Sequence, residues 1–154
     1  MDDYERDENR VEQLDRHWIE LLQELRLAQT GTQIFFAFLL TIAFTQPFRD
    51  ADRFTHLVFA GTLITSAIAM GLFLAPVSFH RLTYQQKVRD KMLPIAGRLT
   101  IVGMVFLVVA IAGGLLLALD VVLGRNEAYV VVAVVLAIVL VSWYGLPAWV
   151  RRVS

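Results

Sequence analysis

Four long stretches of the sequence contain no aspartate, glutamate, lysine, arginine or histidine, and this feature constrains the fold more than any other. They cover residues 34–45, 57–79, 99–119 and 128–150. A helix needs about 20 apolar residues to cross roughly 30 Å of hydrocarbon. The three later stretches have that length, and the first reaches it when the uncharged polar residues before it are included. We therefore expect four membrane-spanning helices, at about residues 28–47, 55–79, 99–123 and 128–149.

The first expected span continues a charged, amphipathic segment. Apolar residues recur there at steps of three and four, which places them on one stripe of a helix. No proline interrupts the chain before Pro47, so we expect one long helix with a bend at Gly31. Residues 1–9 are expected to form a disordered acidic tail. The stripe is a candidate interaction surface and consists of Val11, Leu14, Trp18, Leu21 and Leu25.

The predicted fold is all-α: a four-helix transmembrane bundle in which an amphipathic cytoplasmic N-terminal helix is continuous with the first span. Residues 10–154 are expected to form a single membrane domain. Eleven of the 14 lysines and arginines lie in the N-terminal segment, the 80–98 loop and the C-terminal tail, and three lie in the other two connectors. Because basic residues favour the cytoplasmic side, both termini are expected there, in a bacterial cytoplasmic membrane. The chain has no cysteine, which excludes disulfides, thiol catalysis and zinc–thiolate sites.

Smaller features predict how the spans begin, end and pack. Small residues recur on the second span, at Gly61 and Gly71 among others, and such faces allow helices to approach closely. The third span has a similar face, formed by Gly103, Ala110, Gly113 and Gly114. Pro76 is expected to kink or end the second span. The 48–54 connector is expected to have no structure of its own, and a short surface helix in the 80–98 loop is expected to stop before Pro94.

The run DRHWIELLQELRLAQTGTQIFFAFLLTIAF, followed later by APVSFHR, resembles a known family. This is a family of small actinobacterial membrane proteins of unknown function, DUF6328. The resemblance is clearest from Arg10 to Arg98 and implies a four-span protein. Some members are labelled sodium–proton antiporters, but the family supplies no catalytic residues to carry over.

Three polar groups are weighed as sites. Gln29, Thr30, Thr32 and Gln33 form a candidate polar collar at the cytoplasmic mouth of the first span, more consistent with contacts between helices than with a substrate site. His80 and Arg81 are candidate lipid-headgroup contacts, although such pairs more often anchor a helix end. A divalent metal site would need His17, Glu20, Glu24 and His80. It is disfavoured because charged residues on an exposed helix face are usually solvated, so no metal or cofactor is expected.

The function follows mainly from what the spans lack. Ion-coupled transport normally needs an ionisable residue deep in the membrane, whereas Asp120 and His56 are expected at the outer rim. We expect a non-enzymatic membrane protein that assembles with a second copy or a membrane-protein partner through its cytoplasmic helix, in contact with lipid and not with nucleic acid. The alternative is a small oligomeric channel or uncoupled transporter with the collar as its mouth.

Overall fold

The computed structural model describes residues 10–82 and 89–145. Within these ranges the chain is helical and has no strand. The elements are α1 (Arg10–Ala43), α2 (Gln46–Arg49), α3 (Arg53–Leu82), α4 (Arg89–Leu123), α5 (Arg125–Leu140) and a π-helical turn, η1 (Val141–Gly145). The expected acidic tail at residues 1–9 and residues 146–149 of the fourth expected span lie outside the described residues.

Four of the described helices are long and apolar enough to cross a membrane: α1, α3, α4 and α5 together with η1. Large apolar side chains cover their outer surfaces, as a chain surrounded by lipid requires. The expected all-helical fold, with four helices long and apolar enough to cross a membrane, is therefore confirmed. The α1 helix also passes through Gly31 without a break, as predicted.

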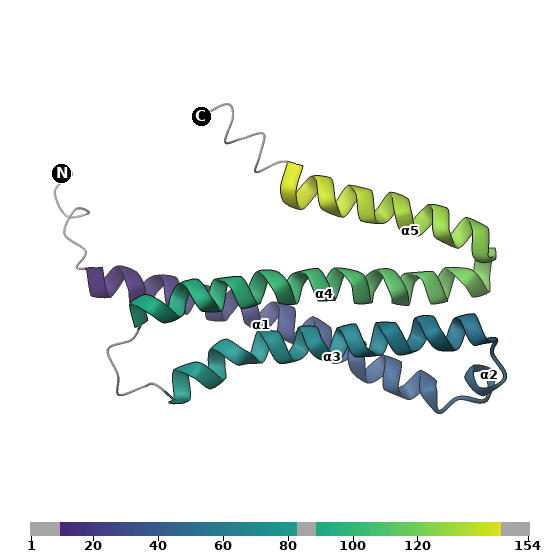
Figure 1. The fold of residues 1–154 in the computed structure, drawn as a ribbon, viewed down its shortest axis with the longest axis horizontal. Coiled ribbons are helices and arrows are strands. Elements are labelled where there is room, and N and C mark those ends of the chain that lie inside the picture. Colours follow the sequence, from purple (N-terminus) through teal and green to yellow (C-terminus); the bar gives the residue numbers. More distant parts are fainter. Residues whose placement is uncertain (1–9, 83–88, 146–154) are drawn as a thin grey trace.

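Helices α1, α3 and α4 pack on one another, whereas α5 packs mainly on α4 and reaches the start of α3 through the Tyr129–Phe54 ring contact (Figure 1). It lies on the side of α4 away from α1 and α3, so the bundle is a three-helix core with a fourth helix outside it. The first residues of α1 and the gap between α3 and α4 share one end of the molecule, the N-terminal end. Helix α2 and the α4–α5 junction share the opposite end, the connector end.

The α3–α4 pair is the closest in the fold, and glycines on α4 explain why. A Cβ atom on Gly103 would lie 2.7 Å from the Phe73 ring, and one on Gly113 would collide with the Thr62 hydroxyl. Ala110 on the same face is fully buried. The predicted small-residue face of α4 is thus confirmed. Its counterpart on α3 is not, because a Cβ on Gly61 or Gly71 meets no atom within 4 Å.

The expectations about connectors and prolines need correction. Residues 48 and 49 of the 48–54 connector belong to a helical turn, α2, because Pro47 suits the first turn of a helix, which begins after Thr45. Pro76 does not end the second span, because helix α3 continues through it to Leu82. Helix α4 begins before Pro94 and includes it. Pro94 lies near the start of α4, and its missing N–H leaves one carbonyl of the first turn without its helical donor.

Candidate functional site

The described residues line a half-open cavity of about 630 Å³ at the connector end, between α1, α2, α3 and α4. Its walls are mainly apolar and include four phenylalanines, Phe35, Phe38, Phe48 and Phe59. Phe35 lies against Gly114, where a Cβ would come within 2.7 Å of the ring, so this glycine lets α1 reach α4 at one side of the cavity. The lining residues from α1 and α4 include Phe35, Phe38, Leu39, Ile42, Gly114, Leu117, Ala118 and Val121.

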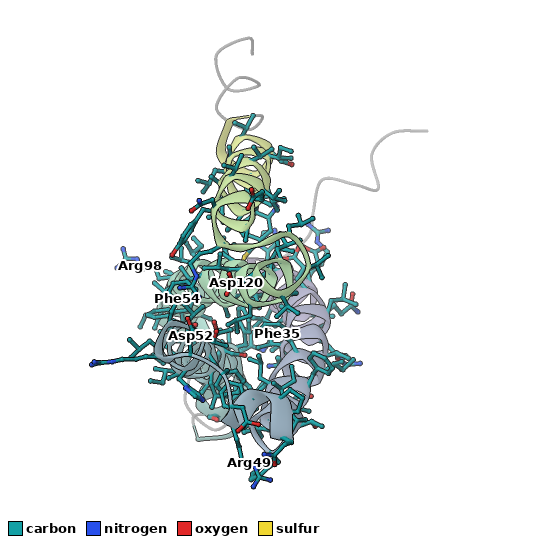
Figure 2. The ribbon with its side chains drawn as sticks, turned by 90° about the vertical axis from the view of Figure 1, so that its right-hand side faces the viewer. Phe35, Arg49, Asp52, Phe54, Arg98 and Asp120 are labelled. Carbon is teal, nitrogen blue, oxygen red and sulfur yellow. The ribbon has the colours of Figure 1, made fainter. Side chains whose placement is uncertain are left out.

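Three charged side chains line the cavity: Asp52, Asp120 and Arg125. Arg125 Nη2 lies 2.6 Å from Asp52 Oδ2 and 3.3 Å from Asp120 Oδ2. The Arg125 guanidinium also stacks over the Phe54 ring, 4.0 Å from its centroid. Figure 2, which views the connector end, shows Asp52, Phe54 and Asp120 close together and Arg49 pointing away. The arginine therefore joins the α4–α5 junction to the start of α3.

Asp52 has a second role, because it caps α3. Its Oδ1 accepts hydrogen bonds from the Thr55 backbone N–H at 2.9 Å and from the Thr55 hydroxyl at 2.6 Å. An N-cap aspartate satisfies a backbone donor that the first turn of a helix leaves free. The Thr55 hydroxyl, and after it Arg125, holds the pKa of Asp52 far below its usual value. Asp52 is thus an aspartate that stays ionised at any physiological pH.

His56 holds the short helix α2 beside the cavity. Its Nε2 lies 2.9 Å from the Phe48 carbonyl, and the two rings meet edge to face with centroids 4.8 Å apart. Phe48 also packs on Phe59, with ring centroids 4.4 Å apart. Both phenylalanines line the cavity. The His56 ring therefore holds Phe48 in the wall of the cavity, and the contact with the Phe48 carbonyl in turn positions the His56 ring.

The predicted interaction stripe on α1 lies partly inside the molecule. Leu25 is 1% exposed and forms a core with Ala69 and Phe73, against which Leu21 packs. Trp18 is half-buried. The side chains of Val11 and Leu14 lie outside the described residues. At its Leu21–Leu25 part, the stripe packs on α3 and α4 of its own chain.

The predicted polar collar does not form a ring. Gln29 Nε2 donates to the Phe73 carbonyl on α3 at 2.7 Å, a contact between helices. Thr32 is fully buried, but its hydroxyl donates to the Ala28 carbonyl of its own helix at 2.7 Å. Thr30 and Gln33 are exposed. Gln29 and Thr32 are the two collar residues whose side chains are buried or half-buried, and neither lines the connector-end cavity.

The remaining predicted sites are dispersed or outside the described side chains. His17, Glu20 and Glu24 are all exposed on α1, and no group of three metal-ligating side chains forms among the residues that the structure describes. The side chains of His80 and Arg81 lie outside that set. The sequence interpretation missed the cavity and Arg125. The available signal was topological: four helices joined in succession place the first and third connectors at the same end of the bundle, so Asp52 and Arg125 lie at that end.

A family model of unknown function, DUF6328, matches residues 7–147. The chain belongs to this family. The matched region includes every helix described above, so the fold and its cavity fall within the family's extent. No curated protein and no solved structure matches the chain.

Proposed function

We propose that the protein is a non-enzymatic, multi-pass membrane protein that binds a membrane lipid in the connector-end cavity. The observation that supports this function is the arrangement of the cavity wall. Apolar side chains from α1 and α4 line one part of it, and the three charged residues lie at helix ends: Asp52 before α3, Asp120 in the last turn of α4 and Arg125 at the start of α5. A lipid has the same arrangement, with an apolar chain below a polar headgroup.

Access to the cavity from the bilayer favours a lipid over a water-soluble ligand. Phe38 is 62% exposed and Val121 is 85% exposed, although both line the cavity. Exposed apolar side chains at the depth of a spanning helix face lipid. An acyl chain that enters between α1 and α4 would pack against these side chains without crossing an aqueous phase.

The polar groups around the cavity support a binding role without catalysis. The Thr55 hydroxyl donates to Asp52, and the Thr45 hydroxyl donates to the Ile42 carbonyl. His56 Nε2 lies on a carbonyl oxygen, so among the described residues no hydroxyl of the cavity is paired with an imidazole base. Nucleophilic catalysis needs such a pair or an equivalent activation.

The two functions expected from the sequence draw less support. Partner docking through α1 would use a stripe whose Leu21–Leu25 part already packs on α3 and α4. A channel mouth would need the collar residues to converge, whereas Thr30 and Gln33 are exposed and the Thr32 hydroxyl donates within its own helix. We keep assembly with a second copy or another membrane protein as the second candidate, with the exposed side of α5 as the available surface.

We propose that the N-terminal end is cytoplasmic, because the basic residues gather there. Reporter fusions test this orientation. Fusions after Asp52 and after Asn126 should report the external side of the membrane. Fusions after Arg89 and after Ser154 should report the cytoplasm. A cytoplasmic signal after Asp52 would overturn the layout.

Filling the cavity tests the proposed function. Ala118→Trp places a large side chain on the cavity wall, whereas the control Val122→Trp places one on a residue of the same helix that does not line it. Purified protein is transferred from phosphatidylethanolamine vesicles to mild detergent, and retained lipid is measured by native mass spectrometry. The parent and Val122→Trp should retain one lipid, and Ala118→Trp should retain none. Equal retention by all three would contradict the proposal.

A further inference from the structure

The charges at the cavity rim do not balance. Two carboxylates, Asp52 and Asp120, face one guanidinium, Arg125. Arg125 already contacts both carboxylates and the Phe54 ring, so its charge is compensated. One negative charge is therefore left over, and a cation fits this rim better than an anion does.

The two carboxylates differ in how well they are satisfied. Asp52 holds short contacts on both oxygens, at 2.6 Å to Arg125 and 2.6 Å to the Thr55 hydroxyl. Asp120 accepts from Arg125 at 3.4 Å on Oδ1 and 3.3 Å on Oδ2. Hydrogen bonds between a cation and a carboxylate usually span about 2.7–2.9 Å. Asp120 therefore has capacity for a closer donor.

Asp120 is also the more enclosed of the two. Its side chain is 15% exposed, against 50% for Asp52. A partly enclosed carboxylate interacts more strongly with a charged donor, because less water screens the pair. Aromatic rings of the cavity wall, among them Phe35 and Phe48, add favourable surfaces for a cation.

We propose that the cavity selects a membrane lipid with a primary-amine headgroup, whose ammonium donates to Asp120. This inference rests on the proposed lipid-binding function and specifies its substrate class. A primary ammonium carries three N–H donors, whereas a trimethylated ammonium of the same charge carries none. The carboxylate should therefore distinguish the two, and it should disfavour an anionic headgroup.

The test compares three lipids with identical dioleoyl chains: phosphatidylethanolamine, phosphatidylcholine and phosphatidylglycerol. Each is titrated into delipidated protein in detergent, and binding is followed by native mass spectrometry. The parent should bind phosphatidylethanolamine about tenfold more tightly than either of the others, because a charge-assisted hydrogen bond is gained. Asp120→Asn should abolish this preference while keeping the weaker binding of phosphatidylcholine. Glu127→Gln, an exposed acid at the same end that does not line the cavity, should keep the preference.

The outcomes separate this inference from the proposed function. Equal affinity of the parent for the three lipids, with binding abolished by Ala118→Trp, would overturn the headgroup selection and keep lipid binding. Binding that Ala118→Trp does not change would overturn both. The melting temperature of each lipid-free variant is measured first. If Asp120→Asn does not fold, a preference for phosphatidylethanolamine in the parent supports the selection and equal affinities overturn it.

Discussion

In the middle of the bundle, α1, α3 and α4 pack around Leu25, Ala69 and Phe73, whereas at the connector end the same helices line a half-open cavity of about 630 Å³. An arginine joins the connectors beside this cavity by ion pairs. The difference indicates that the middle of the bundle is built for close packing and the connector end for holding space between the same helices.

The largest expected effect comes from adding a side chain where α4 approaches α3 most closely in the packed middle of the bundle. Gly103→Leu would push into the fully buried Phe73 ring, which already lies 2.7 Å from the position of a Cβ atom. Overpacking of this kind costs about 3 kcal/mol at its upper range. At the exposed control position Gly71 a Cβ meets no atom within 4 Å, so Gly71→Leu should be neutral or slightly stabilising. Unfolding of both variants in mixed micelles measures the difference, and equal stabilities would refute the packing described for α3 and α4.

A smaller loss of stability is expected when a core side chain in the packed middle of the bundle is truncated. Leu25→Ala removes a 1% exposed side chain from the core, whereas the control Leu27→Ala removes one that is 79% exposed. In lipid the loss is mainly van der Waals contact, so we expect about 2 kcal/mol, the low end for leucine truncation. The same unfolding assay applies. If Leu27→Ala were the more damaging change, α1 would pack through its other face.

The smallest expected effect concerns the ion pairs of the connector end. The pKa of Asp52 is depressed in the folded state, so its stabilising contribution is complete above the unfolded pKa of about 3.9 and declines as the pH falls below that value. Between pH 8 and pH 5 this group contributes no pH dependence. Melting temperatures from pH 7 to pH 3 should fall less steeply for Asp52→Asn than for the parent, and Asp50→Asn should match the parent. Identical curves for all three would show that the capping contacts do not stabilise the fold.

The spans and the continuity of α1 could be predicted from the sequence because both rest on local properties. A long stretch without ionisable residues is stable in few environments other than a membrane. Apolar residues that recur at steps of three and four, with no proline between them, predict one continuous helix. The α4 face with Gly103 and Gly113 was also predictable, because small residues permit close contact wherever a partner is available.

The position of α5 and the connector-end cavity could not be predicted. In lipid a helix gains nothing from an amphipathic face, so the valine-rich sequence of α5 does not indicate which neighbour it chooses. For the same reason, the small residues Gly61 and Gly71 suggest helix–helix contact positions in the sequence, although they are not contact positions in the structure. The contact between Arg125 and Asp52 joins residues 73 positions apart. The spacing of apolar residues along the sequence does not predict such a contact between distant positions.

The electron density inside the cavity tests the central claim most directly. Crystals would be grown from a lipidic mesophase that contains phosphatidylethanolamine. We predict an elongated density between Phe35 and Leu117, with a headgroup whose amine lies within hydrogen-bond distance of Asp120. A cavity that is closed by its own side chains, or that holds a helix of a second protomer, would contradict the account.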